Sequence, residues 1–201
     1  MPRIGRPREY DRDAALRAAT YLFWEHGYDA VSLDQLLAAM GGLSKASFYA
    51  AFKSKAELYR EVIAFYLKTH GRVSDDLANQ ALAPRTRLEV ALRRTAAMQS
   101  DPSHPSGCLI ALSAMTAATG GLTRLTADER ARNRAQISQC VREAMENGEL
   151  KPGTDPEGVA ALLDGLLLGI SIMARDGVLK GTLDAAISSA FSSWRSAPAY
   201  H

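Results

Sequence analysis

Apolar residues recur with the period of an α-helix along nearly the whole 201-residue chain. Side chains at i, i+3 and i+4 share one face of a helix, whereas a half-buried strand requires strict alternation of apolar and polar residues. The sequence holds no convincing run of alternating β-branched and polar residues between hairpin turns. It therefore predicts an all-α fold of about nine helices.

Helix caps and glycine or proline pairs predict where these helices begin and end. The expected helices span 13–26, 32 to the glycines at 41 and 42, 44–52, 54–70, 85–99, 106–118, 127–146, 156–175 and 183–195. Three capping boxes support the starts: Ser32 with Gln35, Ser54 with Glu57, and Thr126 with Glu129. We expect a helix-turn-helix domain with a basic arm over 1–70, whose fourth helix joins a helical domain over 71–201.

The charge is distributed unevenly along the chain. Residues 1–70 hold 10 Lys and Arg against 8 Asp and Glu, whereas residues 71–201 hold 14 of each, so the net charge of +2 belongs to the first third. The basic first residues lack the apolar core of a signal peptide, and the apolar run from Val159 to Met173 contains Asp164 and is short for a bilayer span. We expect a cytoplasmic protein without a membrane partner.

Residues 32–58 have the composition of a helix-turn-helix that binds DNA. No acidic residue lies between positions 35 and 57, yet Lys45, Lys53 and Lys55 are present, which favours attraction to phosphate. The short helix at 44–52 opens with Ser44, Lys45, Ala46 and Ser47. Small or hydrogen-bonding side chains there allow a helix N-terminus to approach base edges in the major groove.

Further groups around this helix are predicted to hold phosphates. The helices that begin at Ser32, Ser44 and Ser54 offer backbone amides and the positive end of their dipoles, and the Tyr49 hydroxyl lies on another face from Phe48 and Phe52. An arm with three arginines precedes the domain and suits an adjacent minor groove. The predicted DNA-binding residues are Arg3, Arg6, Arg8, Ser32, Leu33, Ser44, Lys45, Ala46, Ser47, Tyr49, Lys53 and Lys55.

The glycine turn, the Ser-Lys pair, the Phe-Tyr-x-x-Phe spacing and the following Lys-Ser-Lys closely resemble the DNA-binding domain of the TetR family of bacterial repressors over residues 10–70. The resemblance implies a divergent helical ligand domain, a homodimer formed by the last two helices, and release from operator DNA when a small-molecule effector binds. It also implies phosphate contacts from Tyr49 and Lys55 and base contacts from residues 44–47. Most members carry one glycine where this chain has Gly41 and Gly42, which predicts a rotated or more deeply set recognition helix.

The helix over 156–175 is apolar nearly all round, so it is either buried in the monomer or shared with a partner. The resemblance favours a partner. The predicted dimer interface comprises Leu162, Leu163, Leu166, Ile170, Ile187, Phe191 and Trp194. The predicted effector pocket comprises Met98, Cys108, Leu112, Met115 and Leu166, although the same side chains would serve any packed core.

Cys108 supports an alternative function. A thiol near the positive end of a helix can have a lowered pKa, and this would make the chain a repressor that senses electrophiles or oxidants. A DNA-binding dimer without any effector is a second alternative. His104 and Cys108 are two potential ligands and do not make a metal site. We expect no metal, no cofactor and no enzyme activity, because the sequence shows no paired-carboxylate, nucleophile or phosphate-loop motif.

Overall fold

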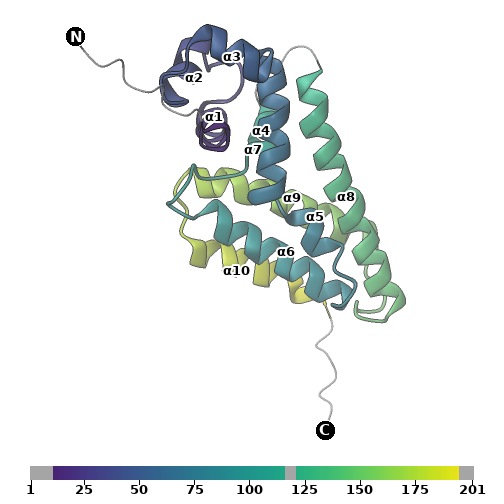
Figure 1. The fold of residues 1–201 in the computed structure, drawn as a ribbon. Helices are drawn as coiled ribbons and strands as arrows, with labels where there is room; N and C mark the ends of the chain where they lie inside the picture. Colours follow the sequence, from purple (N-terminus) through teal and green to yellow (C-terminus); the bar gives the residue numbers. More distant parts are fainter. Residues whose placement is uncertain (1–10, 116–120, 195–201) are drawn as a thin grey trace, which may run out of the picture.

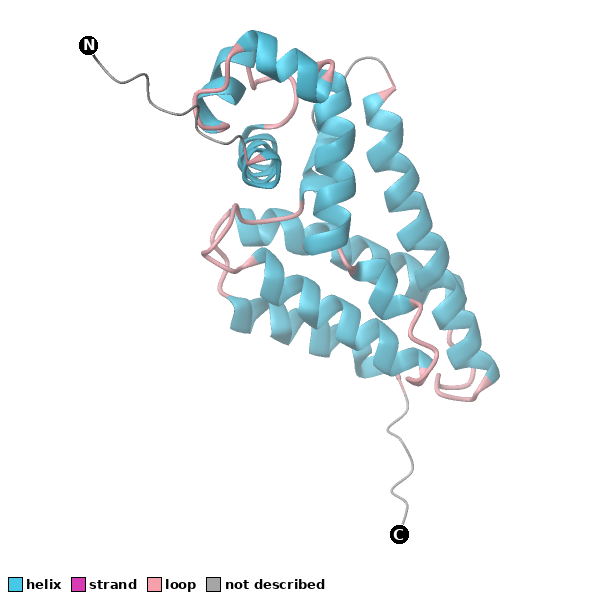
Figure 2. Ribbon diagram, in the orientation of Figure 1, coloured by secondary structure: helices cyan, strands magenta, loops and turns pink. Residues whose placement is uncertain are grey.

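The computed structural model describes residues 11–115 and 121–194 (Figure 1). Figure 2 shows helices joined by loops throughout these residues, which confirms the predicted all-α class. The described helices are α1 (Arg12–His26), α2 (Leu33–Ala39), α3 (Lys45–Phe52), α4 (Lys55–Thr69), α5 (Val73–Leu77), α6 (Pro84–Gln99), α7 (Leu109–Leu112), α8 (Leu122–Glu146), α9 (Pro156–Arg175) and α10 (Lys180–Ala190). Two short 3₁₀ helices follow α7 and α10, at Ser113–Met115 and Phe191–Ser193.

Local capping fixes the helices of the N-terminal domain. The Asp11 carboxylate accepts hydrogen bonds from two amides of the first turn of α1, at 3.0 Å each. Gly27, with φ of 78°, ends that helix. Ser32 and Gln35 form both hydrogen bonds of the predicted capping box at the start of α2. The predicted starts of these two helices are therefore confirmed.

Aromatic side chains form the core of the N-terminal domain. Phe23, Phe48, Phe52 and Tyr66 are essentially inaccessible to solvent and belong to one apolar cluster. Phe48 and Phe52 lie four residues apart and hold α3 against the other helices, on another face from Tyr49. Burying one such side chain stabilises the fold by about 1.5 to 3 kcal/mol, so the cluster fixes the orientation of α3.

A second apolar cluster joins α6, α8, α9 and α10. Leu163 and Ile170 of α9 lie fully buried at its centre. Among the described helices α9 alone is long and apolar enough to cross a membrane, and part of its apolar surface is buried in this cluster. An ion pair between buried Arg87 and Glu143 joins α6 to α8.

Four of the described helices differ from those expected. The short α5 was not predicted. The helix expected over 106–118 is reduced to α7 and a 3₁₀ turn within the described residues, which end at 115 before resuming at 121. Helix α8 begins at Leu122, so Thr126 and Glu129 lie inside it, where the Thr126 hydroxyl donates to the carbonyl of Thr123 at 3.2 Å. Helix α10 begins at Lys180, and its regular part ends at Ala190.

The two apolar clusters do not divide at residue 70. Leu109 and Ile110 of α7 and Leu122 of α8 pack with the aromatic core of the N-terminal domain. The domain boundary predicted at residue 70 lies at the end of α4. The N-terminal apolar cluster nevertheless extends to residues of α7 and α8. As a result α7 lies between the two parts of the molecule.

Candidate nucleic-acid interface

Helices α2 and α3 lie at one end of the molecule, away from α6 and α10 (Figure 1). Gly41 and Gly42 reverse the chain between them with φ values of 85° and 76°. The amides of Gly42 and Leu43 both donate to the carbonyl of Leu37 at 3.0 Å. Both glycines therefore occupy the conformation that side chains disfavour. How deeply this turn sets α3 against DNA stays a prediction.

Helix α3 has a buried face and an exposed N-terminus. The Ser44 hydroxyl accepts from the amide of Ser47 at 3.1 Å and caps the helix. The side chains of Lys45, Ala46 and Ser47 are exposed, and Tyr49 is 51 % exposed. The residues predicted to contact bases and phosphate are thus presented to solvent by a helix whose opposite face is anchored.

Lys45 has an acidic neighbour that the sequence pattern did not reveal. Its ammonium lies 3.4 Å from a carboxylate oxygen of Asp34, in the first turn of α2. In the sequence Asp34 lies just before the stretch without acidic residues. The fold places its negative charge beside Lys45. Both side chains are strongly exposed, and an exposed ion pair contributes little to stability.

Lys53 connects α3 to α4 through an unusual backbone conformation. Its φ is 63°, the only positive value at a non-glycine residue in the described chain. The amide of Ser54 donates to the carbonyl of Phe52 at 2.6 Å, so Lys53 is the central residue of a γ-turn. Such strain persists where surrounding structure enforces it, often at functional sites. The turn brings Ser54 to the N-terminus of α4, where its hydroxyl accepts from the amide of Glu57 at 3.0 Å.

Lys55 lies over the Tyr28 ring, with its ammonium 4.3 Å from the ring centroid. Burial lowers the pKa of Lys55, and nearby Asp29 partly opposes this shift. A cation held over an aromatic face is restricted in direction. Lys55 is therefore more constrained than exposed Lys45 and Lys53.

The remaining predicted DNA-binding residues divide into two groups. Ser32 is exposed at the N-cap of α2, and Leu33 is half-buried against the aromatic core. The arm residues Arg3, Arg6 and Arg8 lie outside the described residues.

The predicted dimer interface requires correction. Leu163, Ile170, Ile187, Phe191 and Trp194 are at most 4 % exposed and belong to the core of a single chain. Side chains that are buried within one chain offer no surface to a partner. Helical periodicity marks an apolar face, but it does not identify whether that face is covered within the monomer. Leu166 is half-buried and Leu162 is 54 % exposed.

Within the described residues, the predicted effector-pocket side chains belong to different apolar clusters. Met98 and Cys108 pack against the N-terminal aromatic core, whereas Leu166 packs against the C-terminal one. Leu112 lines two cavities. The side chain of Met115 lies outside the described residues.

The packing around Cys108 opposes the lowered pKa expected of a reactive thiol. Burial raises the pKa of Cys108, and the neighbouring Tyr66 side chain offsets this only in part. Tyr66 is itself fully buried. His104 stacks on Trp24, with ring centroids 4.7 Å apart, and within the described residues no three His, Cys, Asp or Glu side chains gather as metal ligands do.

Sequence reasoning missed Arg175, the last residue of α9. Its guanidinium donates to the backbone carbonyl of Trp24 at 3.2 Å and also to that of Glu25. It lies 3.4 Å from the Glu25 carboxylate as well. These contacts join residues about 150 positions apart, so no local pattern predicts them.

Comparison with known proteins assigns both halves of the chain to one family. Residues 15–62 match the family described as bacterial regulatory proteins, tetR family, and residues 84–176 match the tetracyclin repressor-like C-terminal domain. The HTH-type transcriptional repressor ComR of Escherichia coli is 31 % identical over 179 residues, covering 86 % of this chain and 83 % of ComR. The HTH-type transcriptional repressor BdcR of Escherichia coli is 34 % identical, covering 53 % of each chain.

A solved structure supports the same assignment. A cysteine mutant of the TetR family transcriptional regulator CifR, complexed with 26-bp double-strand operator DNA, aligns with a TM-score of 0.82 and 35 % identity. The alignment covers 94 % of this chain and all of that chain.

Proposed function

This chain belongs to the TetR family of bacterial regulatory proteins, which are DNA-binding transcription factors and not enzymes. From this premise we propose how it binds its operator DNA. The α3 helix enters the major groove of double-stranded DNA, and the bound protein represses transcription from that site. The observation that carries the proposal is the division of α3 into two faces. Phe48 and Phe52 anchor it, while Ser44 to Ser47 and Tyr49 face solvent.

Charged and polar groups around α3 are proposed to hold the DNA backbone. Lys45 and Lys53 are exposed cations, and Lys55 is directed by the ring of Tyr28. Phosphate contacts fix the position of a protein on the duplex, whereas side chains at the N-terminus of a recognition helix read base edges. We assign Lys53, Lys55 and Tyr49 to phosphate and residues 44–47 to bases. The arm arginines Arg3, Arg6 and Arg8 extend this surface toward the minor groove.

A homodimer would place two copies of α3 on one palindrome. Leu162 and Ile172 of α9 are 54 % and 47 % exposed, and both are large apolar side chains on a helix whose other face is buried. Gly165 lies between them in sequence and is exposed. This face of α9 is proposed as the dimer interface, in place of the buried residues predicted from sequence. Two-fold symmetry separates recognition helices by about 34 Å, one turn of DNA.

We also propose that a small-molecule effector releases this cytoplasmic regulator from its operator DNA. An effector that binds more tightly to the released conformation weakens operator binding, and a coupling of about 1 to 3 kcal/mol corresponds to a change of about 5- to 150-fold. Helix α4 joins α3 to the C-terminal domain, so movement of α4 would change the spacing of the paired recognition helices.

The test is fluorescence anisotropy with DNA that flanks the protein's own gene, compared with unrelated DNA of equal length at several salt concentrations. We expect tighter binding to the flanking DNA, with one dimer per palindrome. Tyr49→Phe should weaken binding to all DNA, and Lys53→Gln should also reduce the salt dependence by about one phosphate contact. Equal, steeply salt-dependent binding to both DNAs would contradict sequence-specific repression.

A further inference from the structure

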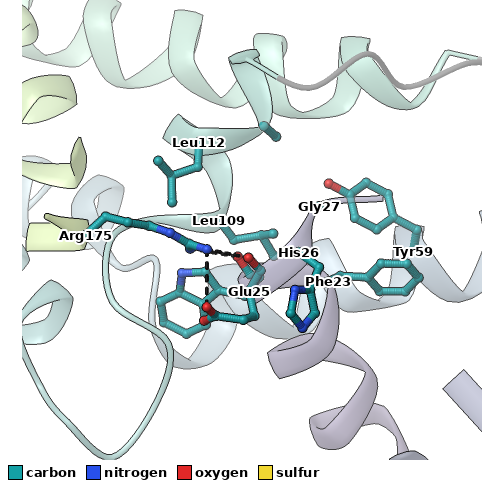
Figure 3. Close-up of a pocket in the computed structure, with 10 residues that line it drawn as sticks. Phe23, Glu25, His26, Gly27, Tyr59, Leu109, Leu112 and Arg175 are labelled. Carbon is teal, nitrogen blue, oxygen red and sulfur yellow. Dashed lines mark hydrogen bonds and ion pairs between the residues drawn. The ribbon is translucent and has the colours of Figure 1, made fainter. Parts of the chain in front are cut away.

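A cavity of about 230 Å³ lies between the two parts of the molecule. The end of α1 and Tyr59 of α4 line it from the DNA-binding domain, and α7 and the last residue of α9 line it from the C-terminal domain. Figure 3 shows Arg175 reaching from α9 toward Glu25, with Leu109 and Leu112 beside it. A molecule bound here would touch the helix that packs on α4 and the helix that carries the proposed dimer face.

Arg175 closes this junction by capping α1 from another domain. The last carbonyl groups of a helix have no partner within it, and Arg175 donates to those of Trp24 and Glu25. The guanidinium is also attracted to the negative end of the α1 dipole. Arg175 is therefore a direct link between the C-terminal end of α9 and the DNA-binding domain.

The lining of the cavity combines apolar walls with hydrogen-bond donors. Phe23, Trp24, Leu109 and Leu112 supply the walls, and Arg175 supplies a fixed positive charge. Trp24 is 2 % exposed, and its indole N–H has no hydrogen-bond partner within the described chain. The indole nitrogen is itself inaccessible to solvent, so the positive charge offered to a ligand comes from Arg175.

We propose that this cavity binds a small carboxylic acid with an apolar body, and that the carboxylate draws Arg175 away from α1. The proposal rests on the proposed function and names the effector site within it. A carboxylate carries a full negative charge where the backbone carbonyl groups are neutral, and guanidinium matches a carboxylate with two parallel bonds. Such a ligand uncouples α1 from α9 and thereby releases operator DNA.

The size and charges of the cavity narrow the ligand class further. Drug-sized sites span about 300 to 1,000 Å³, so this cavity suits an acid with one ring or a short chain. The Glu25 carboxylate, 3.4 Å from the guanidinium and half-exposed, competes with the ligand for Arg175. A neutral ligand of the same shape would fill the apolar part without displacing Arg175.

The experiment is calorimetric titration of the full chain with benzoate, phenylacetate and hexanoate, each compared with its uncharged amide. We expect the acids to bind and the amides to bind at least about tenfold more weakly. Arg175→Gln should weaken acid binding by about tenfold or more, and Arg142→Gln, at a half-exposed arginine elsewhere on the surface, should leave it unchanged. Glu25→Gln should tighten acid binding about fivefold, whereas Glu57→Gln, at an equally exposed glutamate on α4, should not.

Operator binding is measured in parallel, with and without each acid, so that the two proposals fail separately. We expect the acids to weaken operator binding by the unaltered protein and not by Arg175→Gln. Equal binding of acids and amides, equal acid binding by Arg175→Gln, or no acid binding by a protein that binds its operator would overturn the effector site alone. Acid binding that depends on Arg175 in a protein that does not distinguish operator DNA would support the site and refute the repressor.

Discussion

Replacing Lys53 with glycine should stabilise the protein while weakening its hold on DNA. Lys53 adopts φ of 63° and ψ of −48° at the centre of the γ-turn between α3 and α4. A residue held in such a conformation costs about 1 to 3 kcal/mol. Glycine removes most of that strain but loses about 0.5 to 1 kcal/mol through the entropy of the unfolded chain. We therefore expect a net gain of about 1 kcal/mol.

The measurement is urea unfolding, in which the midpoint should rise without a change in slope. For a chain of this size the melting temperature should rise by about 2 to 4 °C. Lys53→Ala is the matched control, because it removes the same charge and keeps the Cβ atom. Both variants should bind DNA more weakly with the same loss of salt dependence. If Lys53→Gly is no more stable than Lys53→Ala, the γ-turn carries no relievable strain and the reasoning is refuted.

Three further perturbations test the core, the dimer and the domain junction. Phe48→Ala should lower the free energy of unfolding by about 3 to 5 kcal/mol, because the ring is fully buried; a loss below about 1 kcal/mol in urea unfolding would contradict the packing described. Leu162→Glu should convert dimers to monomers in analytical ultracentrifugation, while Met145→Glu, at a similarly exposed apolar residue of α8, should not; dissociation by both or neither would remove α9 from the interface. Burial and the neighbouring His104 lower the pKa of His70, so folding favours the neutral ring. That contribution is complete above the ordinary pKa of about 6.5 and is lost as the pH falls through the lower folded value. His70→Gln should therefore lose less stability between neutral and mildly acidic pH than the unaltered chain, and parallel pH profiles would refute this assignment.

The sequence by itself determined the features that depend on short-range chemistry. The caps at Asp11, Ser32 and Ser44 and the glycine turn act within a few residues, so their effects could be predicted from the residues alone. The spacing of Phe48 and Phe52 likewise fixed which face of α3 is buried. For the same reason the exposed face of α3, on which the proposed DNA interface rests, follows from the local order of residues.

Only the tertiary structure decided features that depend on distant contacts. Ile170 and Ile187 have the apolar character of an interface, yet the fold covers them within one chain, because periodicity marks an apolar face without naming what covers it. The sequence placed Cys108 near a helix start, but packing around its thiol raises its pKa. The link from Arg175 to α1 exists because two helix ends about 150 residues apart meet in space, and no local pattern encodes that meeting.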